Sequence, residues 1–277
     1  MSHRLSSPMY LASNPPMTES IDIPEQSREA WNRIADRGDE YYVAASKQEI
    51  EWARKGDIRI KLTPTKNVPP EWIGTVKGCD VLLLACGGGQ QSPLFAAAGA
   101  STTVFDISEK QLARDRQIAD QYDLNIEIVR GDMADLSAFK PNSFDLIINP
   151  CSVCYCDDVH IIWSETERIM KPGAKLMSGF IKPVNYLFDA LAMEEEELVV
   201  QNRIPYRDTD LPAEHQQLIL GPERPLEFGH SLSQLIGGQL RAGLQLVGFY
   251  EDRWGDDDLL SQYIDVFAAT LSIKPEA

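Results

Sequence analysis

Polar residues and glycines follow several short apolar segments of the chain, at the positions where buried strands would end. The apolar segment VLLL at residues 81–84 runs into a glycine loop, ACGGGQQ, which contains Ala85, Gly87, Gly89 and Gln90. Where side chains are missing, the backbone can approach a ligand closely, and we expect its main-chain N–H groups to face that ligand. The loop therefore predicts a binding site.

Three further apolar segments end in residues that suit a nucleoside. TTVFD ends at Asp106, whose carboxylate can accept hydrogen bonds from the two hydroxyls of a ribose. The next segment leads to GDM, where Asp132 and the backbone of Met133 can read the edge of an adenine, and FDLIIN ends at Asn149. The carboxyl ends of parallel strands meet at one edge of a sheet, so we expect these residues to share one cofactor site.

The elements that must position these residues follow from the pattern between residues 80 and 180. Apolar runs of strand length alternate with amphipathic helical stretches, which is typical of βαβ units around a parallel sheet. Two closing segments, LQLVGFYED and YIDVFAATLSI, predict an antiparallel final pair. The expected fold is α/β: a Rossmann-like, doubly wound, mostly parallel sheet of seven strands with an antiparallel C-terminal strand.

Helix caps are expected at three serines. Ser92 is predicted to cap the helix that follows the glycine loop. Ser108 and Gln111 have the spacing of a capping box, and so do Ser231 and Gln234.

The domain organisation predicted from the sequence has three parts. Residues 1–25 are expected to be a disordered tail, residues 26–76 a helical preface and linker, and residues 77–277 the catalytic core. The βαβ rhythm is lost within the core, so residues 183–228 are expected to be an insertion that caps the substrate pocket. Aromatic residues of the preface, Trp31, Tyr41 and Tyr42, are candidates for a lid over the same pocket.

Composition excludes several classes of partner. The net charge of −16 repels phosphate backbones and anionic lipids, so we expect neither nucleic acid nor membrane as a partner. The first 24 residues hold no apolar run of secretory or membrane length, which predicts a cytoplasmic protein. The five cysteines are expected to be reduced, and CSVCYC lacks a second ligand pair for zinc, so no metal is predicted.

Taken in order along the chain, five of these patterns resemble class I S-adenosylmethionine-dependent methyltransferases. They are the glycine loop, the acidic end of the second strand, GDM, SFDLII and RIMKPGAKL, and they cover about residues 80–180. The resemblance implies that S-adenosyl-L-methionine is the cofactor. It also extends to an uncharacterised bacterial branch that acts on small molecules and has the LACGGGQQ style of loop.

The resemblance implies a role for each site residue at the methionine end of the cofactor. Ala85, Gly87 and Gly89 would enclose the methionine part, Asp106 would hold the ribose, and the carbonyl of Asn149 would contact the methionine amino group.

At the adenine end, the resemblance implies that Ile107 packs on the ring. Asp132 would accept from the exocyclic amine, and the Met133 backbone would donate to the ring.

The loop also departs from the family pattern Asp-x-Gly-x-Gly-x-Gly. Leu83 stands in the position of the acidic residue, and Ala85 in that of the first glycine. Gln90 or Gln91 is a candidate to anchor the amino acid end in place of the missing carboxylate.

The implied reaction is displacement at the cofactor's methyl carbon, which needs an aligned nucleophile and the exclusion of water more than a base. Candidates to contact the acceptor are Ser152, Cys154, Tyr155 and Asp157. NPCS partly matches the signature of amine-directed methyltransferases, and CSVCYC leaves open an arsenic methyltransferase, but no catalytic residue is identified.

Three classes of function remain open from the sequence. The first is methyl transfer to a small-molecule acceptor through oxygen, nitrogen or sulfur. The second is an NAD(P)-dependent oxidoreductase, although GGGQQS lacks the third glycine of GxGxxG. The third is a noncatalytic protein that binds S-adenosylmethionine.

Overall fold

A seven-stranded sheet forms the centre of the molecule. The computed structural model describes residues 22–38, 43–211, 224–255 and 258–276. The strands of the sheet are β1 (Asp80–Leu84), β2 (Ser101–Asp106), β3 (Ile126–Arg130), β4 (Phe144–Asn149), β5 (Met170–Ile181), β8 (Gln245–Asp252) and β9 (Phe267–Ile273).

The strand order is β3-β2-β1-β4-β5-β9-β8. The first five strands run parallel, whereas β9 lies between β5 and β8 and is antiparallel to both. The predicted fold class is therefore confirmed. Because β1 pairs with β2 on one side and β4 on the other, the winding direction reverses there, and ligands of such sheets bind at the carboxyl ends beside this reversal.

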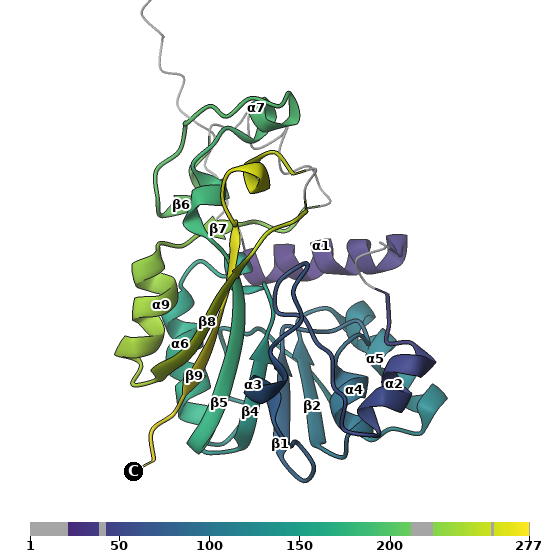
Figure 1. Cartoon of the computed structure of the whole chain (residues 1–277). Helices are drawn as coiled ribbons and strands as arrows, with labels where there is room; N and C mark the ends of the chain where they lie inside the picture. The colour runs from purple at the N-terminus through teal and green to yellow at the C-terminus, as the bar shows by residue number, and fades with distance from the viewer. Residues whose placement is uncertain (1–21, 39–42, 212–223, 256–257, 277) are drawn as a thin grey trace, which may run out of the picture.

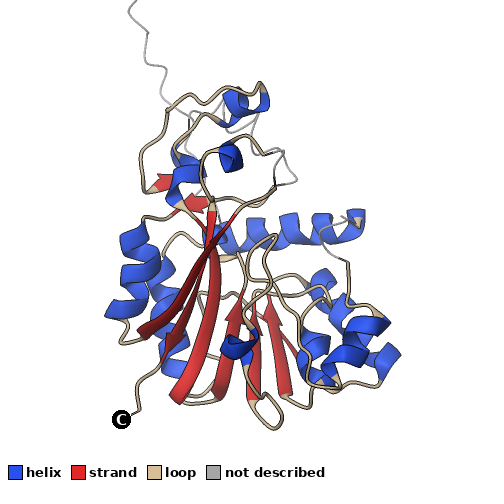
Figure 2. Cartoon of the chain, in the orientation of Figure 1, coloured by secondary structure: helices blue, strands red, loops and turns tan. Residues whose placement is uncertain are grey.

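Helices cover both faces of the sheet (Figure 2). One face carries α2 (Lys47–Ala53), α3 (Pro70–Ile73), α4 (Ser92–Ala97) and α5 (Glu109–Tyr122), and the other carries α6 (Val159–Ile169) and α9 (Leu232–Arg241).

Strand β1 is buried on both faces. Val81 and Leu83 belong to the apolar core on the α5 side, while Leu82 and Leu84 belong to the core on the α6 side. All four side chains are fully buried, which explains why the segment is continuously apolar rather than alternating.

The N-terminal helix α1 (Ile23–Arg37) crosses above the carboxyl ends of the parallel strands (Figure 1). Asp22 caps it by accepting from the Glu25 N–H at 3.1 Å, so the end of the expected tail, residues 23–25, is already helical. The rest of that tail, residues 1–21, lies outside the described residues. A side-chain bond from Ser108 to Asn32, 2.7 Å long, ties α1 to the start of α5.

The part of the expected insertion that the structure describes contains short elements only. These are η3 (Pro183–Tyr186), α7 (Ala190–Glu194), β6 (Tyr206–Arg207), η4 (Asp208–Asp210) and β7 (Phe228–Gly229). Strands β6 and β7 form a separate two-stranded sheet.

Two of the three predicted caps are confirmed. Ser231 and Gln234 form a complete capping box. At Ser108 only half of the expected box forms: the hydroxyl accepts from the Gln111 N–H, but the Gln111 side-chain oxygen does not accept in return. The prediction for Ser92 is wrong, because α4 begins at Ser92 itself and its hydroxyl donates to the buried carboxylate of Asp115.

Candidate functional site

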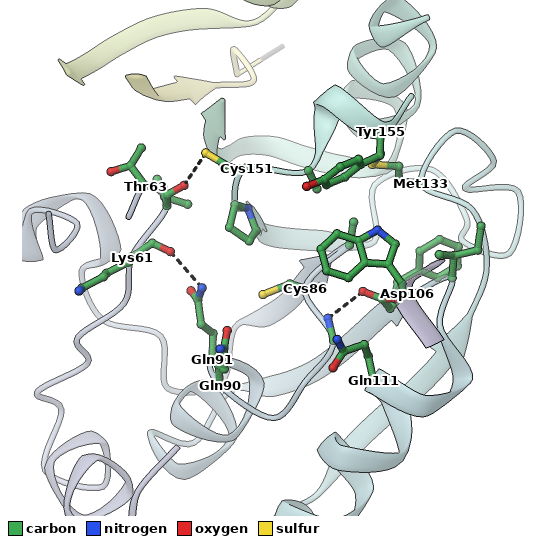
Figure 3. A pocket seen from close by; sticks show the side chains of 18 of the residues that line it. Lys61, Thr63, Cys86, Gln90, Gln91, Asp106, Gln111, Met133, Cys151 and Tyr155 are labelled. Atoms are coloured by element: carbon green, nitrogen blue, oxygen red, sulfur yellow. Dashed lines mark hydrogen bonds between the residues drawn. The ribbon is translucent and has the colours of Figure 1, made fainter. Parts of the chain in front are cut away.

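A cavity of about 1560 Å³ opens at the carboxyl ends of the parallel strands. Its wall combines the glycine loop, the ends of β2 and β3, the segment after β4, helix α1, parts of residues 59–67, and Trp254, Gly255 and Asp258. Figure 3 shows part of this wall, with Gln90 of the loop, Asp106 at the end of β2 and Tyr155 after β4. Pockets for one small molecule usually enclose roughly 300–1000 Å³, so this cavity has room for two ligands side by side.

Most of the site residues expected from the sequence line this cavity. They are Ala85, Gly87, Gln90, Asp106, Ile107, Asp132 and Met133.

Gly89 and Asn149 do not line the cavity. A methyl group on Gly89 would lie 3.1 Å from Ile118 Cγ1, so this glycine allows close packing of the loop on α5. The Asn149 side chain is fully buried and donates to the Leu84 carbonyl at 3.1 Å and to Ser152 Oγ at 2.7 Å. It therefore joins β4 to β1 and to the turn that follows.

The glycine loop is turned differently from our expectation. The Gly87 N–H donates to Asp106 Oδ2 at 2.9 Å, and the Gly88 N–H donates to Asp115 Oδ2 at 2.8 Å. These N–H groups are already occupied, so the prediction that they face a ligand is wrong. In a trans peptide the C=O points opposite to the N–H, so the carbonyls of Cys86 and Gly87 point away from the two carboxylates.

The two carboxylates make the surroundings of the loop electronegative. Burial raises the pKa of Asp106, while the N–H groups of Ser108 and Gly87 act against that rise. Burial likewise raises the pKa of Asp115 to about 6, against the hydrogen bonds from Ser92 and Gly88. Carbonyl oxygens backed by carboxylates suit a cationic ligand and disfavour a diphosphate.

Backbone geometry explains the need for small residues in the loop. Gly88 has φ +121° and Gly89 φ +71°, and Ala85 has φ +49°, in the left-handed region that favours glycine. Gly87 is restricted by space, because an added Cβ would lie 2.9 Å from Gln111 Cβ and 3.1 Å from the Asp106 carboxyl group.

The end of the cavity beside β2 and β3 offers both an acceptor and a donor. Asp132 Oδ1 accepts from the Ala134 N–H at 3.0 Å, and burial raises the pKa of this carboxyl. No described residue accepts a hydrogen bond from the Met133 N–H. Ile107 contributes an apolar side chain to the same wall.

Three buried side-chain oxygens on the cavity wall have no hydrogen-bond partner among the described residues. They are Ser27 Oγ, Gln91 Oε1 and Gln111 Oε1. Buried polar atoms are normally satisfied, so these oxygens indicate where a bound ligand would donate or accept. Neither Ser27 nor Gln111 was expected in the site, because Ser27 lies on an amphipathic helix with no local motif and Gln111 was expected only as the capping partner of Ser108.

The candidates after β4 divide into two groups. Ser152, Tyr155 and Asp157 line the cavity, and Asp157 lies 3.4 Å from Arg207 in an ion pair. Cys154 does not line it, and burial raises the pKa of its thiol well above the usual value.

The thiols on the cavity wall are held in their neutral form. Burial raises the pKa of Cys86 and Cys151, and raises that of Cys156 to about 12. The Cys151 thiol also donates to the Leu62 carbonyl at 3.3 Å. Since thiolates are the nucleophiles and metal ligands, these neutral thiols are poor candidates for either role.

The cover of the cavity differs in part from our prediction. Trp31 lines it, whereas Tyr41 and Tyr42 lie outside the described residues. No described residue of the insertion 183–228 lines the wall, and the prediction that this segment covers the pocket stays a prediction. Trp254 and Asp258, from the connection between β8 and β9, also line the cavity.

Comparisons with known proteins agree with one another. A family model described as a methyltransferase domain matches residues 82–178. An uncharacterised methyltransferase of Bacillus subtilis, YbaJ, is 45% identical over 246 residues, which are 88% of this chain and 96% of the relative. A ubiquinone biosynthesis O-methyltransferase of Sinorhizobium fredii is 28% identical over 49% of this chain and 53% of its own length.

The fold is similar to those of solved methyltransferases. The crystal structure of an S-adenosylmethionine-dependent methyltransferase from Mesorhizobium loti superimposes with a TM-score of 0.57 over 73% of this chain and 94% of that one, at 19% identity. Among the described residues, no helix is both long and apolar enough to cross a bilayer.

Proposed function

The chain belongs to the S-adenosylmethionine-dependent methyltransferases, and on that basis we propose that it transfers the methyl group of S-adenosylmethionine to a small-molecule acceptor. The observation that carries the proposal is the orientation of the peptide groups in the glycine loop. Asp106 and Asp115 bind the N–H groups of Gly87 and Gly88, and we propose that the carbonyls of Cys86 and Gly87 accept from the ligand. S-adenosylmethionine has an ammonium and a sulfonium group that suit such acceptors.

The adenosine part would be held by the residues at the ends of β2 and β3. We propose that Asp106 accepts from the ribose hydroxyls with the lone pairs that Gly87 and Ser108 leave free. Asp132 would accept from the adenine amine and the Met133 N–H would donate to the ring, with Ile107 packed on its face.

The methionine part would lie against Ala85, Gly87 and Gln90. The buried Gln91 Oε1 is an additional acceptor there, since Gln91 Nε2 is already engaged by the Lys61 carbonyl at 3.0 Å. Gly89 and Asn149 would support the site from behind, through packing on α5 and bonds between strands.

The bound cofactor supplies an activated methyl group, and this chain supplies alignment and the exclusion of water. The acceptor would occupy the part of the cavity near Tyr155, Asp157 and Trp254, beside the segment after β4. Helix α1 crosses over this region and would shield it from solvent (Figure 1). We propose that a site covered by α1 in this way takes a small acceptor rather than a macromolecule.

Charge narrows the class of acceptor. Six carboxylates line the cavity, Asp22, Glu49, Asp106, Asp132, Asp157 and Asp258, against two cations, Arg59 and Lys61. Arg59 is paired with Asp57 at 2.6 Å. A neutral or cationic acceptor is therefore favoured over an anionic one. The five unpaired cysteines fit a reducing compartment, so we propose that the reaction takes place in the cytoplasm.

A transfer experiment with labelled cofactor tests the proposal. The purified chain is incubated with S-adenosylmethionine carrying a labelled methyl group and with fractionated metabolite extract or total cellular macromolecules. We expect label in the small-molecule fraction, and none with the Asp106→Ala variant. Label confined to protein or nucleic acid would contradict the small-molecule acceptor, and no transfer despite tight binding would favour a noncatalytic binding protein.

A further inference from the structure

Asp115 is a buried carboxylate that lies outside the cavity wall. It belongs to α5, its side chain is fully buried, and no ion pair formed by the described residues includes it. Burying an unpaired carboxylate is costly unless hydrogen bonds stabilise it. Its partners are the Gly88 N–H, at 2.8 Å, the Ser92 hydroxyl and the Gly89 N–H.

These partners lie close together on one continuous segment of the chain. Gly88 is in the middle of the glycine loop, and Ser92 is the first residue of α4. A single carboxylate from a third element therefore fixes both the loop and the helix that follows it. Leu83, at the end of β1, is fully buried in the apolar core and offers no acceptor to the loop.

The bond to Gly88 sets the direction of one peptide group. With its N–H held by Asp115, the Gly87–Gly88 peptide points the Gly87 carbonyl in the opposite direction. Asp106 does the same for the preceding peptide and the Cys86 carbonyl. Both Cys86 and Gly87 line the cavity, whereas Gly88 does not.

We propose that Asp115 is a positioning residue that turns the Gly87 carbonyl toward the cationic end of the cofactor. It takes over, from α5, the loop-anchoring role that the residue at position 83 cannot perform here. The identity of the cofactor in this proposal rests on the proposed function. The orientation of the loop does not, and it can be measured in the protein without cofactor.

Hydrogen exchange of the Gly88 amide tests the loop orientation directly. In the parent chain without cofactor we expect this amide to be protected. Asp115→Ala removes the acceptor and should speed its exchange by about tenfold or more. Asp115→Asn keeps an oxygen for Gly88 and an amide that can donate to Ser92, so it should preserve most of the protection.

Titration with S-adenosylmethionine then tests the consequence for binding. We expect Asp115→Ala to weaken the affinity by about tenfold, and Asp115→Asn to restore it to within about threefold of the parent. Gln239→Ala is the matched control, since Gln239 is also fully buried and hydrogen-bonded, to Thr270 and Ser272, away from the cavity. It should lower stability and leave the affinity unchanged.

The outcomes separate this proposal from the proposed function. The positioning role would be overturned by a folded Asp115→Ala variant in which the Gly88 amide exchanges as slowly as in the parent and the affinity for S-adenosylmethionine is that of the parent. Equal loss of affinity in Asp115→Ala and Gln239→Ala would overturn it too, because general destabilisation would then explain both. If the parent itself bound no S-adenosylmethionine while Gly88 exchange still responded to Asp115, the loop orientation would stand and the proposed cofactor would fail.

Discussion

Trp31 of helix α1 packs edge to face against Tyr155 of the turn after β4, with ring centroids 5.2 Å apart. Both side chains line the cavity. The contact joins the N-terminal helix to the region proposed for the acceptor. This region follows β4, whereas α5 follows β2 on the other side of β1. Helix α1 therefore contacts both sides of the cavity. Trp31 contacts the turn after β4, and Asn32 accepts from Ser108 at the start of α5.

Loss of the Trp31 ring should loosen the packing of helix α1 over the cavity. Ring contacts of this kind contribute about 0.5–1.5 kcal/mol, so we expect Trp31→Ala to weaken S-adenosylmethionine binding by about two- to tenfold. Trp31→Phe should recover most of the loss. Titration calorimetry measures both, and Phe249→Ala, which removes an exposed ring outside the cavity wall, is the control. Parental affinity in Trp31→Ala would show that α1 does not cover the cofactor.

Asp106→Ala should remove most of the cofactor affinity. Hydrogen bonds to a carboxylate contribute about 1.5–3 kcal/mol each, which corresponds to a loss of at least about 100-fold if both ribose bonds disappear. Asp135→Ala is the control, because Asp135 is exposed and lies off the cavity wall. An Asp106→Ala variant that binds S-adenosylmethionine as the parent does would disprove the assigned ribose contact.

The burial of Asp115 should appear in the pH dependence of stability. Its pKa is about 6 in the folded chain against 3.8 in the reference state, so the folded chain binds more protons between these values. The cost of the buried charge is absent below about pH 4, grows as the pH rises, and is complete above about pH 6.

The Asp115→Asn substitution also tests the free-energy cost of the buried Asp115 charge. At pH 7.5, Asp115→Asn should raise the free energy of unfolding by on the order of 1–3 kcal/mol, and the difference should shrink toward pH 4.5. Denaturant unfolding at several pH values measures it. A difference that does not change with pH would show that Asp115 titrates as an ordinary carboxyl.

Two exchanges between glycine and alanine in the loop should have opposite effects. Ala85 has φ +49°, so Ala85→Gly relieves a left-handed alanine and should raise the free energy of unfolding by up to about 1 kcal/mol. Gly87→Ala forces a methyl group against Asp106 and Gln111, and should lower both stability and cofactor affinity. Thermal unfolding with calorimetry distinguishes them, and equal responses would contradict the described loop geometry.

The fold was predictable because its signals are local. VLLL, with no polar residue between residues 81 and 84, indicates a strand buried on both faces, and the spacing of Val159, Ile162 and Trp163 indicates the helix α6. The strand ends that carry Asp106 and Asp132 followed from the same periodicity. These residues reach the cavity because parallel strands bring their carboxyl ends together.

The orientation of the peptide groups in the glycine loop could not be predicted from such local signals. The Gly88 N–H is bound by a carboxylate 27 residues further along the chain, and nothing near Asp115 marks it as different from a solvated helix residue. The prediction that Ser92 caps α4 was wrong for the same reason, since the Ser92 hydroxyl donates to Asp115. Contacts between distant elements set these groups, and sequence spacing does not report them.

Titration of the intact chain with S-adenosylmethionine, its demethylated product and NADH tests the central claim most directly. The account predicts that the first two bind, because the loop presents carbonyls backed by Asp106 and Asp115, and that NADH does not, because its diphosphate would face those carboxylates. Binding of NADH with no binding of S-adenosylmethionine would contradict the account.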